Sequence, residues 1–241
     1  MVDKTGFRKH ISQQYNKELE DIRNQVLAMG GMVEQQLIDA VTALVNGDRE
    51  LAERVVTNDY KVNALEVAID EECTRVLARR QPAAGDLRLI IAVIKTITDL
   101  ERIGDEAERI GRMAVHLGDE AGGSKTIGAV ERLGELVRKN LHDALDAFAR
   151  VEPESAAQVA REDLKVDREY EAVLRQLITY MMEDPRSIPA VLDVVWSARS
   201  LERIGDRARN ICEYVIYLVH GKDVRHTSLE QVEREARGEG R

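Results

Sequence analysis

Apolar residues recur at steps of three and four positions along most of this chain, the spacing that places them on one face of an α-helix. The first such stretch predicts a long helix over about residues 7–45. Its apolar stripe consists of Leu19, Ile22, Val26, Met29, Val33, Leu37, Val41 and Leu44. Gly30 and Gly31 interrupt this helix, so we expect either a kink or a close contact with another helix there.

The same period predicts five further long helices joined by short connections. A second helix would begin after Asp48, a favourable N-cap, and end near Arg80. A third would follow the turn at 81–85 and end near Leu117. The second half repeats this order, with helices expected over about 129–150, 153–183 and 190–219. Antiparallel helices with short loops indicate helical bundles.

An internal repeat organises these helices. Leu100–Asp105, with the sequence Leu-Glu-Arg-Ile-Gly-Asp, recurs letter for letter as Leu201–Asp206. Earlier in each half, Leu37, Asp39, Ala40, Asp59, Lys61 and Val62 match Leu141, Asp143, Ala144, Asp163, Lys165 and Val166. Matches of this kind indicate a duplication. The predicted fold is therefore all-α, with two tandem homologous three-helix bundles that comprise six long antiparallel helices.

The repeat also predicts the domain boundaries. The first three-helix unit would occupy residues 1–118, the second 127–221, and a charged tail 222–241. The glycine-rich linker at 118–128 is short, so we expect the two units to be in contact. We expect the tail to be frayed apart from a short helix at about 228–236.

The amino-acid composition and net charge limit the fold classes and partners that this protein can have. Of the 241 residues, 44% are hydrophobic but only 4% are aromatic, which favours cores of aliphatic helices. The net charge of −9 disfavours nucleic acid and anionic membranes as primary partners. No apolar run is long enough to span a bilayer, and the N-terminus lacks the apolar core of a signal peptide. We therefore expect a cytoplasmic protein without membrane insertion, in which Cys73 and Cys212 are buried thiols.

Acidic residues flank the predicted core stripes at helical spacing. The positions concerned are Glu101, Asp105, Asp59 and Asn63 in the first half, and Glu202, Asp206, Asp163 and Asp167 in the second. Like charges four residues apart destabilise a helix, and Gly104 and Gly205 between the acids suggest close backbone approach. Oxygen ligands suit hard cations, or iron, manganese or zinc with water completing the coordination. The pattern favours a metal site over the alternative of a solvated acidic face.

Two arginines inside the repeated motif can also be interpreted as either structural or functional residues. Arg102 and Arg203 each follow a motif glutamate. A salt bridge to a neighbouring acid is the favoured interpretation for both. The alternative is a role beside the metal or in holding an anion such as phosphate.

The chain resembles the PhoU family. The resemblance is carried by Gln-Pro-Ala-Ala-Gly-Asp-Leu-Arg at 81–88, by Asp-Leu-Glu-Arg-Ile-Gly-Asp at 99–105, by the second copy of the motif, and by Tyr-Leu-Val-His-Gly-Lys-Asp-Val at 217–224. It extends over nearly the whole chain, including the tandem three-helix organisation.

This resemblance implies a regulatory function. Members of the family are accessory proteins of the phosphate-specific transport system, and they are cytoplasmic and often dimeric without an established catalytic activity. They act as negative regulators of the phosphate-starvation response. The partners implied are the ATPase subunit of the phosphate transporter, a sensor histidine kinase and a second copy of the chain.

The resemblance also implies metal clusters held by Glu/Asp-x-x-x-Asp motifs. Three pairs match this motif: Glu101 with Asp105, Glu202 with Asp206, and Asp163 with Asp167. Asp59 with Asn63 departs from it, because an amide oxygen carries less charge. We therefore expect the second half to bind metal at least as well as the first. The metal would be iron, as a single ion or a multinuclear cluster, or it would be zinc, manganese or magnesium.

Two other functions remain open at this point. One is a di-metal carboxylate bundle that hydrolyses phosphoesters, although no histidine stands three residues after a glutamate as in ferritin-like sites. The other is a metal-free dimerising bundle with incidental acids. Leu89 and Val93, outside the core stripes, would contribute to a dimer surface.

Overall fold

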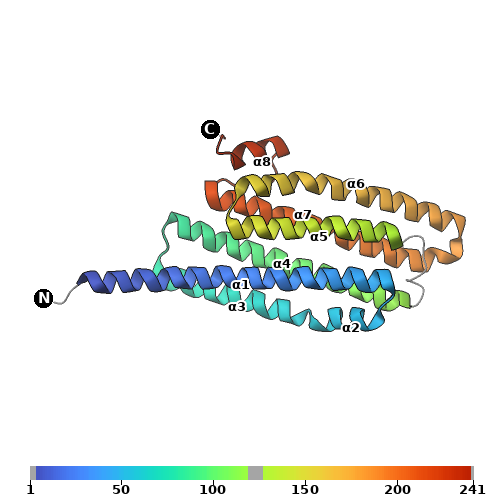
Figure 1. The fold of residues 1–241 in the computed structure, drawn as a ribbon, viewed down its shortest axis with the longest axis horizontal. Helices are drawn as coiled ribbons and strands as arrows, with labels where there is room; N and C mark the ends of the chain where they lie inside the picture. The colour runs from blue at the N-terminus through green and yellow to red at the C-terminus, as the bar shows by residue number, and fades with distance from the viewer. Residues whose placement is uncertain (1–3, 119–126, 240–241) are drawn as a thin grey trace.

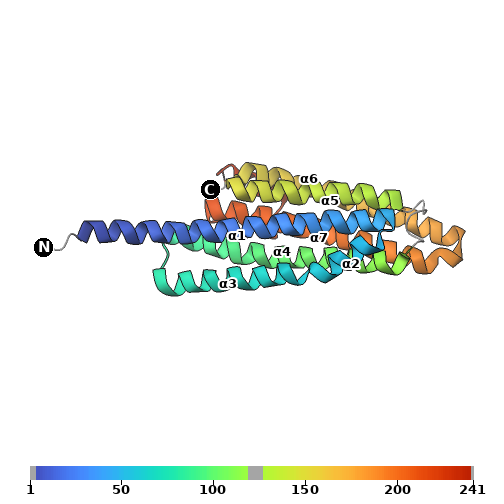
Figure 2. The same ribbon diagram turned by 60° about the horizontal axis from the view of Figure 1, so that its bottom comes forward.

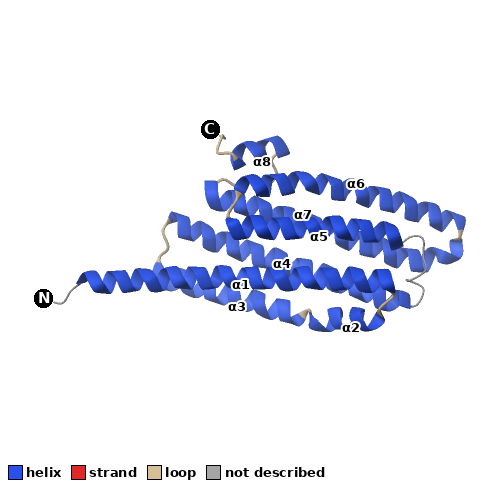
Figure 3. Ribbon diagram, in the orientation of Figure 1, coloured by secondary structure: helices blue, strands red, loops and turns tan. Residues whose placement is uncertain are grey.

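The computed structural model describes residues 4–118 and 127–239, and this part of the chain is almost entirely helical and contains no strand (Figure 3). The α-helices are α1 (Lys4–Asn46), α2 (Arg49–Asn58), α3 (Tyr60–Arg80), α4 (Ala84–Leu117), α5 (Ile127–Arg150), α6 (Pro153–Glu183), α7 (Ile188–His220) and α8 (Leu229–Ala236). A short 3₁₀ turn, η2 (Pro185–Ser187), joins α6 to α7. The predicted all-α fold is confirmed.

The long helices form an elongated bundle (Figure 1). At its centre α4 and α7 run antiparallel, and α3 and α6 pack against their outer sides. Helices α1 and α5 pack against each other and lie across α4 and α7 respectively (Figure 2). None of the described helices combines the length and the apolar content needed to cross a membrane.

Contacts between α1 and α5 follow an approximate two-fold symmetry. Gly30 and Gly134 are equivalent in the repeat, and so are Val41 and Leu145. A Cβ on Gly30 would lie 2.7 Å from Leu145 Cδ2, and one on Gly134 would lie 2.9 Å from Val41 Cγ1. Each glycine therefore accommodates a side chain of the opposite half, and the two contacts are equivalent in the repeat. The close helix contact expected at Gly30 is confirmed, and α1 continues through it as one helix.

Helices α4 and α7 repeat this symmetry with polar side chains. Arg207 Nη1 lies 3.4 Å from Asp99 Oδ1, and Ser200 Oγ donates to Glu106 Oε2 at 2.7 Å. Asp99 is equivalent to Ser200 in the repeat, and Glu106 is equivalent to Arg207. The two contacts are thus related by the same two-fold axis, and the two copies of the six-residue motif face each other across it.

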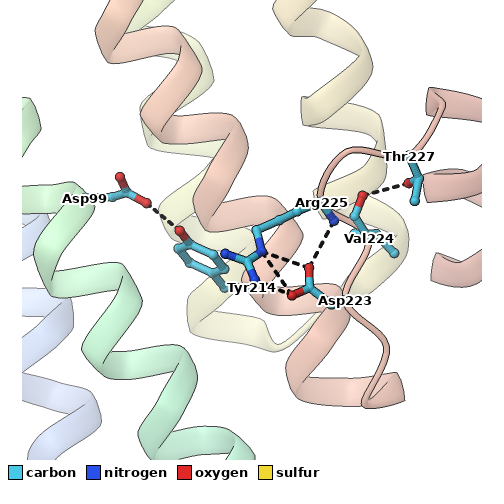
Figure 4. A network of polar contacts seen from close by, with 6 residues as sticks. All are labelled: Asp99, Tyr214, Asp223, Val224, Arg225 and Thr227. Carbon is cyan, nitrogen blue, oxygen red and sulfur yellow. Dashed lines mark hydrogen bonds and ion pairs between the residues drawn. The ribbon is translucent and has the colours of Figure 1, made fainter.

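Two separate groups of polar contacts lie near each other where this seam meets the C-terminal segment (Figure 4). Tyr214 donates from its hydroxyl to Asp99 Oδ2 at 2.7 Å, which joins α7 to the buried carboxylate on α4. Beside it, Arg225 Nε donates to Asp223 Oδ1 at 2.9 Å within the segment that follows α7.

One hydrophobic core runs through both halves. Buried side chains from α1 to α7 belong to a single cluster, which includes Leu37, Ile103, Leu141 and Ile204. The expected contact between the two units is therefore confirmed. Most of the linker predicted at 118–128 lies outside the described residues.

The second predicted helix is divided into α2 and α3 at Asp59. This residue keeps helical dihedral angles (φ −56°, ψ −35°), but Asp59 O accepts a three-residue bond from Val62 N at 2.9 Å and only a longer four-residue bond from Asn63 N at 3.4 Å. The apolar period therefore continues through the interruption, which is why the pattern predicted one helix. Asp48 is the N-cap as expected, accepting from Leu51 N at 2.9 Å.

The short helix expected at about 228–236 is confirmed as α8, whereas the expectation of a frayed tail around it is wrong for residues 222–227 and 237–239. Ser228 caps α8 by accepting from Gln231 N at 3.3 Å. Helix α8 packs against α6 and α7 and buries Val232 and Ala236, and Val224 is also buried. The prediction failed because the segment is mostly charged and only a few apolar side chains pack it against the bundle.

Both cysteines are free and buried, as expected. Burial raises the pKa of the Cys73 thiol to about 12 and places the pKa of Cys212 well above its usual range. Neither thiol is therefore activated as a nucleophile.

Candidate metal centre

The glycine of each repeated motif faces a buried aspartate of the neighbouring helix. In the first half a Cβ on Gly104 would lie 3.1 Å from Asp59 Oδ1, and in the second half one on Gly205 would lie 3.0 Å from Asp163 Oδ1. Asp59 is 6% exposed and Asp163 is 3% exposed. The close backbone approach expected at these glycines is confirmed, and it is what allows a carboxylate between the two helices.

Two amide side chains hold the aspartate of the first half. Gln36 Nε2 donates to Asp59 Oδ1 at 2.9 Å, and Asn63 Nδ2 donates to Asp59 Oδ2 at 3.2 Å. Gln36 extends from α1 and was not singled out by the sequence reasoning. A signal was present, because its equivalent Asn140 is also an amide at a core position and is also buried.

The aspartate of the second half has no such donors. Asn140 is one methylene shorter than Gln36, and its Nδ2 has no hydrogen-bond partner. Among the described residues no hydrogen-bond donor reaches Asp163. Nearby, Arg199 Nη1 donates to Glu202 Oε1 at 2.6 Å, whereas Glu202 Oε2 is buried without a partner. The buried aspartate of the second half is therefore free of hydrogen-bond donors, whereas that of the first half is not.

The predicted acids of the second half lie close enough to raise one another's pKa. Burial, with smaller contributions from the charges of Asp167 and Asp206, raises the pKa of Asp163 to about 7. Burial is also the main cause that raises the pKa of Glu202 and of Asp206. Asp206 adds to the shift of Glu202, and Asp167 adds to the shift of Asp206.

The acids of the first half are coupled in the same way. Burial raises the pKa of Glu101, with a further contribution from Asp105. Burial likewise raises the pKa of Asp105, with a further contribution from Asp59. Glu66 on α3 also raises the pKa of Glu101, so the groove between α3 and α4 is lined with carboxylates from both helices.

The donor chemistry of both grooves fits a cation, although the present rotamers do not enclose one. Within the described residues, no group of three or more His, Cys, Asp and Glu side chains is arranged so that it could hold a metal ion. Three buried acceptor oxygens at these grooves nevertheless lack a hydrogen-bond partner: Gln36 Oε1, Asn63 Oδ1 and Glu202 Oε2. Unpaired buried acceptors are costly, and a cation would pair with oxygen atoms of this kind after the carboxylates change rotamer.

The two motif arginines form ion pairs at the α4–α7 seam. Arg203 Nη1 lies 2.9 Å from Glu106 Oε1 on the opposite helix. Arg102 Nη1 lies 3.9 Å from Asp99 Oδ1 on its own helix. This geometry agrees with the favoured salt-bridge interpretation for both arginines. Glu106 was not among the predicted site residues, and its partners Ser200 and Arg203 come from across the seam, while Arg109 pairs with it from its own helix.

Comparison with known proteins gives the family context of these grooves. A PhoU domain matches residues 26–114 and again 130–215. The chain is 55% identical over 238 residues to the phosphate-specific transport system accessory protein PhoU homolog of Pseudomonas putida, covering 99% of this chain and 93% of that protein. It is 52% identical over 233 residues to the phosphate-specific transport system accessory protein PhoU of Escherichia coli, with coverage of 97% and 96%.

Solved structures agree with this relationship. The crystal structure of PhoU from Pseudomonas aeruginosa matches with a TM-score of 0.83 at 55% identity, covering 86% of this chain and all of that one. The phosphate transport system regulatory protein PhoU from Streptococcus pneumoniae matches with a TM-score of 0.81 at 30% identity, with coverage of 87% and 99%. The two domain matches take in both carboxylate grooves, and with relatives that align over nearly their full length they show that this chain belongs to the PhoU family.

Proposed function

We propose that this protein is a non-catalytic regulator of phosphate transport and phosphate homeostasis. It would act in the cytoplasm as an adaptor between the ATPase subunit of the phosphate transporter and a sensor histidine kinase, and it would repress the phosphate-starvation response when phosphate is abundant. The support is the set of relatives described as accessory or regulatory proteins of phosphate transport, which align over nearly their whole length. We also propose that the working form is a homodimer.

Bound metal is the second part of the proposal. Asp163, Asp167, Glu202 and Asp206 would hold it in the second half, and Asp59, Asn63, Glu101 and Asp105 would hold it in the first. The metal would be iron, as a single ion or a multinuclear cluster, or it would be zinc, manganese or magnesium, since all of these accept oxygen ligands. When bound, it would neutralise carboxylates that otherwise repel one another across the groove.

The observation that carries the metal proposal is the motif glycine packed against a buried aspartate. Glycine at a central helix position costs about 1 kcal/mol relative to alanine, and at Gly205 the space gained is filled by a carboxylate oxygen of Asp163 together with the Val166 side chain. Asp163 has no donor among the described residues, whereas both oxygens of Asp59 accept from amides. We therefore propose that the second half binds metal at least as tightly as the first.

Metal analysis of protein purified without chelator tests this proposal. The variants are Glu202→Ala/Asp206→Ala in the second half and Glu101→Ala/Asp105→Ala in the first, compared with the unmodified chain at equal helicity by circular dichroism. We expect stoichiometric metal in the unmodified chain and a loss in each variant, larger in the second-half variant. Loss of metal only from the first-half variant would contradict the ranking, and a chain that takes up no metal on titration would remove the metal from the proposal.

The adaptor role needs its own measurement. Binding of the purified transporter ATPase and of the kinase cytoplasmic portion would be followed by calorimetry, with and without EDTA. We expect both partners to bind the unmodified chain, with weaker binding when the metal is removed. Absence of binding to both partners in the metal-loaded state would refute the adaptor function, whatever the metal content.

A further inference from the structure

Large apolar side chains are exposed at the turn between α6 and α7. They are Ile178 (52% exposed), Met182 (78%), Ile188 (39%), Leu192 (42%) and Trp196 (55%). We call these five residues the tip patch. In both ribbon views the α6–α7 turn projects beyond the neighbouring helices at one end of the bundle (Figures 1 and 2), so nothing in the described chain packs over it.

Helical register places the two parts of the tip patch on one face. Ile178 follows Asp167 by eleven residues, or about three turns, and Ile188 precedes Asp206 by eighteen residues, or about five turns. Each isoleucine therefore points in the same direction as the aspartate on its helix. Asp167 and Asp206 line the same groove between α6 and α7, so the apolar residues on the two helices form one surface that continues this groove towards the turn.

The first half of the chain has only part of this surface. In the repeat, Met182 is equivalent to Ala78 and Trp196 to Lys95, whereas Ile188 and Leu192 have the apolar equivalents Leu87 and Ile91. The Lys95 ammonium lies over the Tyr214 ring, 5.4 Å from its centroid. The duplicated fold therefore tolerates a small residue in place of Met182 and a charged one in place of Trp196.

We propose that the tip patch binds the tip patch of a second copy of this chain. A two-fold rotation would place α6 and α7 against the same helices of the other copy and complete a four-helix contact. At about 200 Å² for a large side chain, the patch exposes roughly 500 Å² on each copy. Two patches would bury roughly 1,000 Å² of apolar area, which approaches the lower limit of specific interfaces before any polar rim is counted.

The rim of the patch favours a second copy over an anionic membrane. Arg175 pairs with Glu171 and Arg186 with Asp184, so both signs of charge surround the apolar centre. A two-fold interface can match opposite charges of this kind, whereas a membrane-binding rim would be basic. The structure also corrects the surface expected from sequence, because Val93 is fully buried in the core and is unavailable to a partner.

This inference rests on the homodimer in the proposed function, and it is independent of the metal. Trp196 is the only tryptophan of the chain, so its fluorescence reports on the patch directly. Sedimentation equilibrium would be measured together with acrylamide quenching over a range of protein concentrations. We expect dimers to form as the concentration rises and Trp196 to become less accessible to quencher in parallel.

The test variant Met182→Ala/Trp196→Lys carries the residues that the first half has at the equivalent positions. We expect it to keep the helicity, melting temperature and metal content of the unmodified chain and to dimerise at least about 30-fold more weakly, as for loss of a central aromatic contact. The control is Val67→Glu, which replaces another apolar side chain (56% exposed) with the residue found at equivalent position 171. It should dimerise normally.

Four results would overturn the inference. The first is a dimer in which Trp196 stays as accessible to quencher as in the monomer. The second is a test variant that dimerises like the control, which would leave the homodimer intact but place its interface elsewhere. The third is a chain that stays monomeric while sedimenting with phosphatidylglycerol vesicles only when the patch is intact. A chain that stays monomeric without vesicle binding would refute both the surface and the proposed homodimer, and leave the regulatory proposal to the partner-binding assay.

Discussion

Replacing Gly205 by Ala tests whether the motif glycine is present to admit the carboxylate of the neighbouring helix. The new Cβ would lie 3.0 Å from Asp163 Oδ1 and 3.2 Å from Val166 Cγ1. Both distances are shorter than a comfortable contact. Val166 is 1% exposed and is stiff at χ1 because it is β-branched, so it has little freedom to move away.

Two opposing effects determine the expected change in stability. Alanine is favoured over glycine inside a helix by about 1 kcal/mol. Overpacking of a closely packed site costs about 1–3 kcal/mol. We therefore expect Gly205→Ala to lower the free energy of unfolding by about 1 kcal/mol, which corresponds to about 2–4 °C in Tm for a chain of this size.

Gly31→Ala is the matched control, because Gly31 also lies inside a helix but a Cβ there would meet nothing within 4 Å. Only the propensity gain applies, so this variant should raise the free energy of unfolding by about 1 kcal/mol and Tm by about 2–4 °C. Thermal unfolding would be followed by circular dichroism at pH 7 in EDTA, so that metal binding does not contribute. If both variants raised Tm equally, the packing explanation of the motif glycine would be refuted.

Two further predictions concern buried carboxylates. The pKa of Asp163 is raised in the folded state, so the stabilisation from its protonated form is present below pH 4 and is lost as the pH rises through about 7. Asp163→Asn should therefore raise Tm in EDTA more at pH 8 than at pH 5. An equal increase in Tm at both pH values would contradict the raised pKa. Tyr214→Phe removes the hydroxyl donor of buried Asp99 and should cost about 2 kcal/mol of unfolding free energy by urea denaturation, whereas Tyr217→Phe should be near neutral.

Helical register was enough to find the carboxylates of the two grooves. Glu202 and Asp206 are four residues apart beside a core stripe, and the same spacing recurs with Asp163 and Asp167 on the preceding helix. An α-helix fixes the direction of each side chain from its position alone. The structure accordingly brings both pairs to one groove, as their mutual effects on pKa show.

The burial of these carboxylates and the identity of their hydrogen-bond partners could not be predicted from helical register. Asp59 and Asp163 are equivalent in the repeat and are both buried, yet Asp59 has two amide donors and Asp163 has none among the described residues. One part of the difference is the methylene between Gln36 and Asn140, which extend from helices distant in sequence, and the other is Asn63, whose equivalent is the carboxylate Asp167. Local spacing carries no information about which side chain of another helix reaches a given atom.

The sequence by itself therefore determined the helical class, the duplication, the family resemblance and the faces on which the acids lie. Each of these follows from local periodicity or from self-similarity along the chain. Only the tertiary structure decided how the halves meet, with Gly30 and Gly134 each accommodating a side chain of the opposite half and with Asp99 joined to Tyr214. Those contacts join residues more than ninety positions apart, and they exist only once both halves have packed into a common core.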